Sequence, residues 1–142
     1  QLTREVTNVD WHGRVALERL TRELREVRSA TVTDLDVSSG VQIWFINANG
    51  NGVCFYRDTS TPGRLMRSNA ASAAACSAVA SNPQPLADKV AANGLNFYYF
   101  KSDGNPAASA TEVYYITVTL LVTEVSSGIS ETYRVTVQPR RF

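Results

Sequence analysis

The chain has 142 residues, of which 44% are hydrophobic and 19% are charged, values that are ordinary for a globular domain. Its 14 basic and 13 acidic residues leave a net charge of +1. This balance gives no reason to expect nucleic acid, a membrane surface or acidic substrates as partners. No stretch reaches the roughly 18 apolar residues of a membrane-spanning helix. We therefore expect a single soluble domain over residues 1–142.

The first segment of the chain carries the clearest pattern. Apolar residues recur at steps of three and four, which predicts one continuous stripe on an α-helix of about residues 2–28. The stripe consists of Leu2, Val6, Val9, Gly13, Ala16, Leu17, Leu20, Leu24 and Val27. On the other faces, acidic and basic residues are paired at i,i+4 spacing, including Glu18 with Arg22 and Arg22 with Glu26. The helix opens without an N-cap, so we expect it to continue upstream of Gln1.

The chain after Ala30 is expected to form β-structure. Residues 41–46 and 52–57 flank a turn that contains an Asn-Gly step, which predicts a β-hairpin. The other expected strands are 31–37, 64–67, 95–101, 112–125 and 132–138. The Ala- and Ser-rich segment 69–85 has no apolar stripe, so it is predicted to be a surface loop anchored by Cys76.

One long helix followed by an antiparallel β-meander over about residues 31–138 predicts an α+β fold. The C-terminal half of the helix is expected to cover one face of the sheet, because both surfaces need an apolar partner. The expected core residues are Ala16, Leu17, Leu20, Leu24, Val27, Ile43, Phe45, Phe97, Ile116, Val118, Leu120 and Val135. The N-terminal part of the stripe has no partner in this arrangement. We therefore expect Leu2, Val6 and Val9 to form an interface with another subunit.

The chain has two cysteines, Cys54 and Cys76. They are too few for a disulfide-dense scaffold or for a four-cysteine zinc site. Their spacing fits a single disulfide and two separate buried thiols equally well.

No pattern in the sequence indicates catalysis. His12 is the only histidine, and without a second histidine or a nearby cysteine it is expected to be a surface residue rather than a base or a metal ligand. No Ser-His-Asp set can be composed without it, and no phosphate-binding glycine loop is present. We predict that the protein is not an enzyme and that it uses no cofactor and no metal.

Two further patterns allow a ligand but fit packing or turns as well. Residues 102–105 (SDGN) offer oxygen ligands that suit calcium, and the same residues are typical of a turn. A set of tyrosines and arginines suits the clamping of single-stranded DNA. This set comprises Tyr98, Tyr99, Tyr114, Tyr115, Arg57, Arg64 and Arg67. Adjacent tyrosines on a strand point to opposite faces, so packing on the sheet explains these residues better.

The order of the segments resembles a known family. Residues 15–25 (VALERLTRELR) are similar to the helix of type IV minor pilins, of the J-type minor pseudopilin of type II secretion, and of minor pilins of the mannose-sensitive haemagglutinin pilus. In that family the helix is followed by short motifs in a fixed order, and most of this chain can be matched to them. The matching segments are 43–45, 52–57, 65–67, 86–104 and 133–140.

This resemblance implies a type IV pilin-like fold and a structural function. The protein would be a minor subunit of a type IV pilus or type II secretion pseudopilus, located at the tip or priming assembly. Its partners would be other minor pilins or pseudopilins, with no nucleic acid as first choice. It would be the periplasmic domain of a precursor held in the inner membrane by an N-terminal hydrophobic segment that is removed here. An oxidising periplasm favours a disulfide between Cys54 and Cys76.

The alternative is a ligand-binding tip module, an adhesin or a DNA-uptake minor pilin. In that case the loop region 59–85 is expected to make the contact with the ligand.

Overall fold

The computed structural model describes residues 2–59, 63–76, 81–123 and 128–139, with the backbone alone described for residues 2–12, 81 and 82. Helix α1 (Leu2–Leu24) opens the chain, and seven strands follow it. The strands are β1 (Leu35–Asp36), β2 (Gln42–Ile46), β3 (Gly52–Arg57), β4 (Gly63–Asn69), β5 (Ser81–Phe100), β6 (Tyr115–Thr123) and β7 (Ser130–Val137). Two 3-10 turns, η1 (Ala73–Ala75) and η2 (Ala110–Glu112), lie between strands. Of the described helices, none combines the length and the apolar character needed to cross a membrane.

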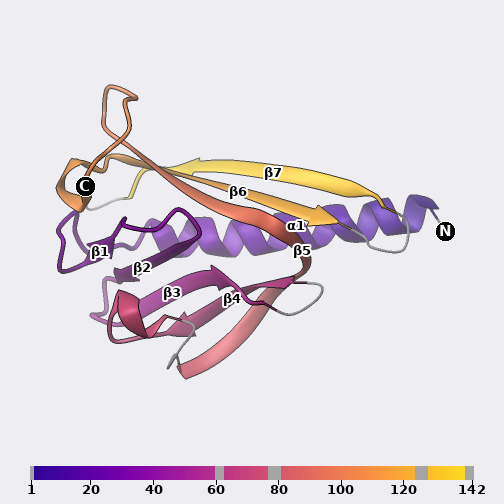
Figure 1. The fold of residues 1–142 in the computed structure, drawn as a ribbon, viewed down its shortest axis with the longest axis horizontal. Coiled ribbons are helices and arrows are strands. Elements are labelled where there is room, and N and C mark those ends of the chain that lie inside the picture. The colour runs from indigo at the N-terminus through magenta and orange to yellow at the C-terminus, as the bar shows by residue number, and fades with distance from the viewer. Residues whose placement is uncertain (1, 60–62, 77–80, 124–127, 140–142) are drawn as a thin grey trace.

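The seven strands form one antiparallel sheet in the order of the sequence, from β1 to β7. The sheet curls into a half-barrel, and α1 runs along its concave side (Figure 1). A backbone hydrogen bond of 2.8 Å from the amide of Phe97 to the carbonyl oxygen of Gly40 links β5 to the segment that precedes β2. The curl therefore brings the first strands of the sheet back towards its middle.

Strand β5 produces this curl. Its first part pairs with β4, from Ser81 opposite Asn69 to Val90 opposite Gly63. Its last part pairs with β6, as in the pairing of Leu95 with Leu120. Between the two parts the register shifts, and the strand contains two residues with positive φ, Lys89 (59°) and Asn93 (58°). These conformations bend the strand, so that one strand of 20 residues belongs to both parts of the sheet.

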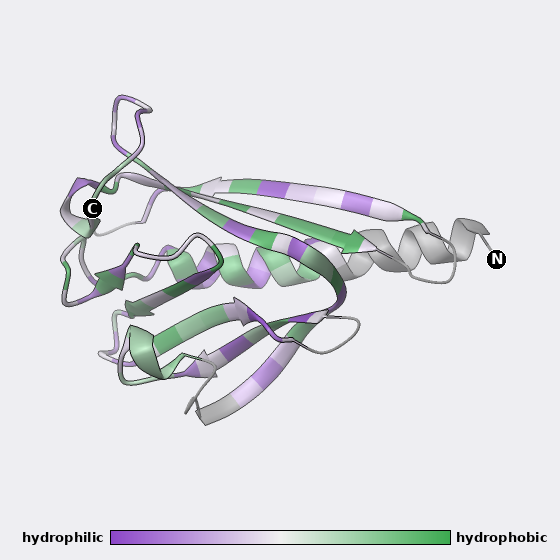
Figure 2. Ribbon diagram, viewed as in Figure 1, coloured by the Kyte–Doolittle hydropathy of each residue, from purple (hydrophilic) through white to green (hydrophobic). Residues whose placement is uncertain are grey.

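The apolar stripe of the helix is buried in the core. Leu20, Leu24 and Val27 have no exposed surface, and Ala16 and Leu17 are 1% and 6% exposed. They belong to one cluster with the inward-facing residues of the strands. The expected core residues on the strands are also buried, except that Val135 is partly buried. Figure 2 shows the hydrophobic residues along β6, which contributes Ile116, Val118 and Leu120 to this core.

Charged side chains attach the helix and the turn after it to the sheet. The Glu23 carboxylate accepts hydrogen bonds from Nε of Arg67 on β4 at 2.7 and 2.9 Å, and one from Arg19 at 3.3 Å. In the turn, Arg28 donates two hydrogen bonds to Asp34, at 2.9 and 2.7 Å, and Ser29 donates one at 2.6 Å. These hydrogen bonds, first those from Arg28, lower the pKa of Asp34 to about 2.

The fold class predicted from the sequence is wrong. It was an α+β, type IV pilin-like fold with a long N-terminal helix packed on a sheet. The described chain is instead mainly antiparallel β-structure, one curled sheet of seven strands with one α-helix of 23 residues. The physical reason is β5. The prediction started this strand at residue 95, but it starts at Ser81 and curls the sheet into a half-barrel with its own core.

Individual elements were predicted with mixed success. The hairpin of β2 and β3 is confirmed, and the strand predicted at 64–67 is present as β4. The strand predicted at 31–37 is reduced to β1, because a turn in which Leu35 donates to the carbonyl oxygen of Thr31 at 2.9 Å precedes it. The predicted loop 69–85 is wrong from Ser81 onward, where β5 begins. The helix ends at Leu24 rather than at residue 28.

Candidate functional site

A groove of about 740 Å³ lies between α1 and β7. Positions three and four apart on a helix share a face, so several side chains of α1 line one wall. The lining residues are Arg14, Leu17, Glu18, Thr21 and Arg22 of α1, Arg25 directly after it, and Tyr133, Arg134 and Val135 of β7. No pattern in the sequence predicted this site.

The groove concentrates positive charge. Four arginines and one glutamate line it, a net charge of +3, although the whole chain carries only +1. All five of these side chains are exposed. Within the described part of the chain, no hydrogen bond or ion pair involves the side chains of Glu18, Arg22, Arg25 and Arg134. The i,i+4 pairs predicted between Glu18, Arg22 and Glu26 are therefore not formed, and the guanidinium groups of Arg22, Arg25 and Arg134 face solvent.

The base of the groove is apolar and tightly packed. Leu17 is buried, and Tyr133 and Val135 are partly buried against the core. The ring of Tyr133 packs directly on the helix at Gly13. A Cβ atom added there would lie 2.2 Å from Cε2 and 2.6 Å from Cδ2 of the ring. Only glycine permits this approach, so Gly13 sets how closely the helix lies beside β7.

Strand β7 is an edge of the sheet. It pairs with β6 over its full length, from Ser130 opposite Thr123 to Val137 opposite Ile116. No other described strand pairs with its outer side. The other edge strand, β1, has only two residues. The groove thus lies beside the long edge of the sheet, where backbone groups are available to another strand.

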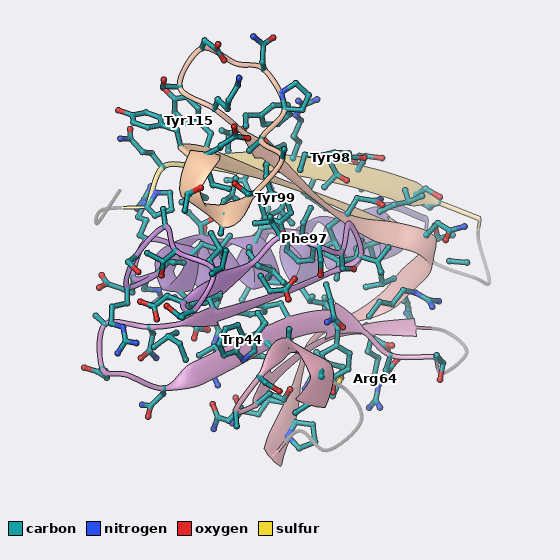
Figure 3. The ribbon with its side chains drawn as sticks, turned by 60° about the vertical axis from the view of Figure 1, so that its left-hand side comes forward. Trp44, Arg64, Phe97, Tyr98, Tyr99 and Tyr115 are labelled. Carbon is teal, nitrogen blue, oxygen red and sulfur yellow. A yellow bond between two sulfur atoms is a disulfide. The ribbon has the colours of Figure 1, made fainter. Side chains whose placement is uncertain are left out.

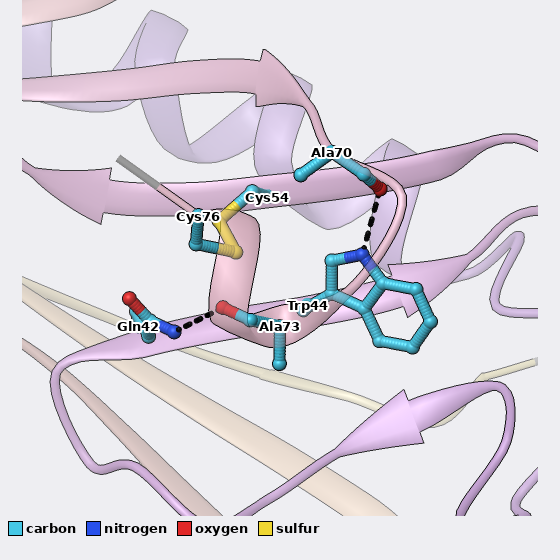
Figure 4. The surroundings of a disulfide bond; sticks show 6 residues. All are labelled: Gln42, Trp44, Cys54, Ala70, Ala73 and Cys76. Atoms are coloured by element: carbon cyan, nitrogen blue, oxygen red, sulfur yellow. Dashed lines mark hydrogen bonds between the residues drawn. A yellow bond between two sulfur atoms is a disulfide. The ribbon is translucent and has the colours of Figure 1, made fainter. Parts of the chain in front are cut away.

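Cys54 and Cys76, whose pairing the family resemblance favoured, are joined by a disulfide with a Cα–Cα distance of 5.9 Å. The bond ties the Ala- and Ser-rich segment to the outer face of β2–β4 (Figure 4). Nε1 of Trp44 donates to the carbonyl oxygen of Ala70 at 2.9 Å, and Nε2 of Gln42 donates to that of Ala73 at 3.3 Å. The segment therefore covers a second, smaller apolar cluster on the face opposite the helix.

The predicted interface residues lie near the start of α1. Leu2, Val6 and Val9 are helical, and their side chains lie outside the described part of the structure, as does the side chain of His12. The N-terminal end of α1 extends past the ends of β6 and β7 (Figure 1). The proposed subunit interface at Leu2, Val6 and Val9 therefore stays a prediction.

The segment predicted as either a turn or a calcium site is a turn. Asp103 accepts hydrogen bonds from the backbone amide of Asn105 at 2.9 Å and from Nδ2 of Asn105 at 3.1 Å. The hydrogen bond from the backbone amide is the main cause that lowers the pKa of Asp103. Gly104 has a φ of +88°. Across the described residues, no three potential ligands among histidine, cysteine, aspartate and glutamate gather into a group that suits a metal ion.

The tyrosines and arginines considered for DNA are not brought together. Figure 3 shows Arg64 far from Tyr98 and Tyr115, on a different part of the molecule. Arg64 pairs with Asp58 at 2.7 Å. Arg67 pairs with Glu23, and Arg57 donates a hydrogen bond to the carbonyl oxygen of Val90. As expected for neighbours on a strand, the two adjacent tyrosines point to opposite faces: Tyr98 is 47% exposed and Tyr99 only 9%.

No protein family, curated protein or solved structure matches this chain. The function of the groove is therefore inferred from its own geometry and charge.

Proposed function

We propose that this protein is a structural minor subunit of a type IV pilus or of a type II secretion pseudopilus, acting through contacts with neighbouring subunits. The observation that carries the proposal is the open edge of β7 beside an arginine-lined groove, because an unpaired edge strand is a ready site for association with another chain. The resemblance of several segments, such as 15–25, supplies the class of assembly. The curled, mainly β fold does not support this class of assembly.

The disulfide supports the proposed location. Disulfides persist in oxidising compartments such as the periplasm and are rare in reducing ones. The bond between Cys54 and Cys76 is consistent with a domain that faces the periplasm, first in an inner-membrane-anchored precursor and then in the assembled filament.

Assembly in cells tests this function. A strain that lacks the gene is complemented with the full-length gene, and pilus or pseudopilus formation is measured. Replacing Val6 and Val9 by aspartate is expected to abolish assembly while leaving the melting temperature of the domain nearly unchanged. Val32 and Val41 are 73% and 57% exposed, so the double replacement Val32→Asp and Val41→Asp is the matched control. Normal assembly by the Val6 and Val9 variant would show that the start of α1 is not an interface.

One observation favours the alternative, a DNA-uptake minor pilin. The arginines of the groove provide the local positive charge that phosphate binding needs. A gel shift with DNA at two salt concentrations tests this alternative. Binding that is strong at low salt, weakens steeply at higher salt and is lost on replacing Arg22 and Arg25 by glutamine would favour it over the structural subunit.

A further inference from the structure

We propose that an extended, acidic segment of a partner subunit pairs with the outer edge of β7 and places its carboxylates in the arginine groove. The proposal rests on the proposed function in taking the partner to be a neighbouring subunit. It adds the kind of segment that binds and the place where it binds.

The backbone of β7 supplies the first part of the interaction. The strand has eight residues, pairs on one side only with β6, and alternates exposed and partly buried side chains up to the buried Val137. A segment pairing along its full length spans roughly 26 Å. Addition of a strand to an exposed edge gives affinity through main-chain hydrogen bonds, and selectivity through pockets for alternate side chains.

The groove supplies that selectivity. From Arg14 to Arg25, which directly follows the end of α1, this wall of the groove extends about 16 Å along the helix axis. Alternate side chains of an added strand are about 6.7 Å apart, so two or three of them face this length of helix. Guanidinium groups bind carboxylates through paired, charge-assisted hydrogen bonds. A segment with acidic residues at alternate positions therefore matches both the spacing and the charge of the groove.

The groove fits an acidic peptide better than a nucleic acid. Binding of single strands relies on several exposed rings on which successive bases stack. Tyr133 is the single aromatic residue lining the groove, and its ring is packed against Gly13. The methylene groups of glutamate side chains, by contrast, can lie on the apolar base formed by Leu17 and Val135.

The test measures binding of a fluorescent peptide of about the length of β7, in which glutamate alternates with threonine. Fluorescence anisotropy with the purified chain gives the affinity. Replacing Arg25 and Arg134 by glutamine is expected to weaken binding about three- to tenfold, since each exposed charge pair contributes little. The matched control replaces Arg64 and Lys101 by glutamine, removing the same charge far from the groove, and is expected to leave the affinity unchanged.

Two further peptides separate strand pairing from simple charge attraction. Each is N-methylated at alternate backbone amides, one at the odd positions and one at the even positions, with all carboxylates retained. Pairing with β7 predicts that one of the two no longer binds. Equal binding by the two N-methylated peptides overturns the proposal. Weakening of peptide binding by the control variant to the same extent as by the Arg25 and Arg134 variant also overturns it. No binding of the parent peptide, or tighter binding of oligo-dT, overturns it as well.

These outcomes are separate from those of the assembly experiment. If the acidic peptide binds as expected but the Val6 and Val9 variant assembles normally, the start of α1 is excluded as an interface and strand addition at β7 stands. If assembly depends on the start of α1 but the peptide fails to bind, the subunit function stands and strand addition fails.

Discussion

Replacing Gly13 by alanine is expected to reverse the usual effect of that substitution in a helix. Alanine in place of glycine at an interior helix position normally stabilises by about 1 kcal/mol. Here the new methyl would lie 2.2 Å from Cε2 of Tyr133, whereas packed carbon atoms are about 3.5–4.0 Å apart. The ring must move by more than about 1 Å, and overpacking of this kind costs about 1–3 kcal/mol. The net change should lie between neutral and about 2 kcal/mol of destabilisation.

A double-mutant cycle measures this effect. Gly13→Ala is made in the natural sequence and in the Tyr133→Val variant, and the free energy of unfolding is determined from urea titrations followed by circular dichroism. Without the ring, Gly13→Ala should stabilise by about 1 kcal/mol, which gives a coupling energy of roughly 1–3 kcal/mol. A coupling energy within about 0.5 kcal/mol of zero would refute the close packing of α1 on β7.

Three more substitutions test other parts of the structure. Leu20→Ala removes a side chain with no exposed surface, so we expect the free energy of unfolding to fall by about 2–5 kcal/mol in urea titrations, and a smaller fall would mean that the site is loosely packed. Replacing Cys54 and Cys76 by serine opens a loop of 22 residues and should cost about 3 kcal/mol in the same assay, whereas an unchanged urea midpoint would contradict this. The lowered pKa of Asp34 contributes stability that is present above about pH 4 and is lost as the pH falls towards 2. Because Arg28 is half exposed, this contribution is smaller than the full pKa shift implies. Asp34→Asn should therefore flatten the dependence of the unfolding free energy on pH between about 5 and 2, and an identical slope in both proteins would exclude this role.

Local patterns predicted the helix and the first hairpin. The helical stripe could be read because Leu20, Leu24 and Val27 follow a spacing that only a helix places on one side. The hairpin could be read because the Asn-Gly step is a strong turn signal between two apolar runs. Both depend on residues that are close in the sequence, so no knowledge of the rest of the fold was needed.

The start of β5 could not be read in this way. Its residues include Pro83, Pro85 and several alanines, a composition typical of a loop. They form a strand because β4 pairs with them, as in the pairing of Met66 with Pro85. Pairing with β6 begins only at Val90, so no described strand pairs with the other side of this part of β5, and proline is tolerated on such edge segments. A long-range partner, rather than local preference, decides the conformation, and this is why the predicted fold class failed.

The candidate groove was missed for a related reason. The sequence predicted that Glu18, Arg22 and Arg25 lie on a helix, and charge spacing suggested that Arg22 pairs with Glu18 and Glu26. Their exposure depends on where β7 lies beside the helix, and nothing near them in the sequence specifies this position. A signal was nevertheless present: the last strand of a meander is an edge, and Arg134 lies on it.

The continuity of β5 has a mechanical consequence. Its first half is hydrogen-bonded to β4 and its second half to β6, so a pulling force along the strand passes through one covalent backbone into both parts of the sheet. Such a force loads the flanking hydrogen bonds in parallel, in shear, rather than opening them one after another. The left-handed bend residues Lys89 and Asn93 are the points where the strand can straighten first. The domain would then lengthen there before any strand separates.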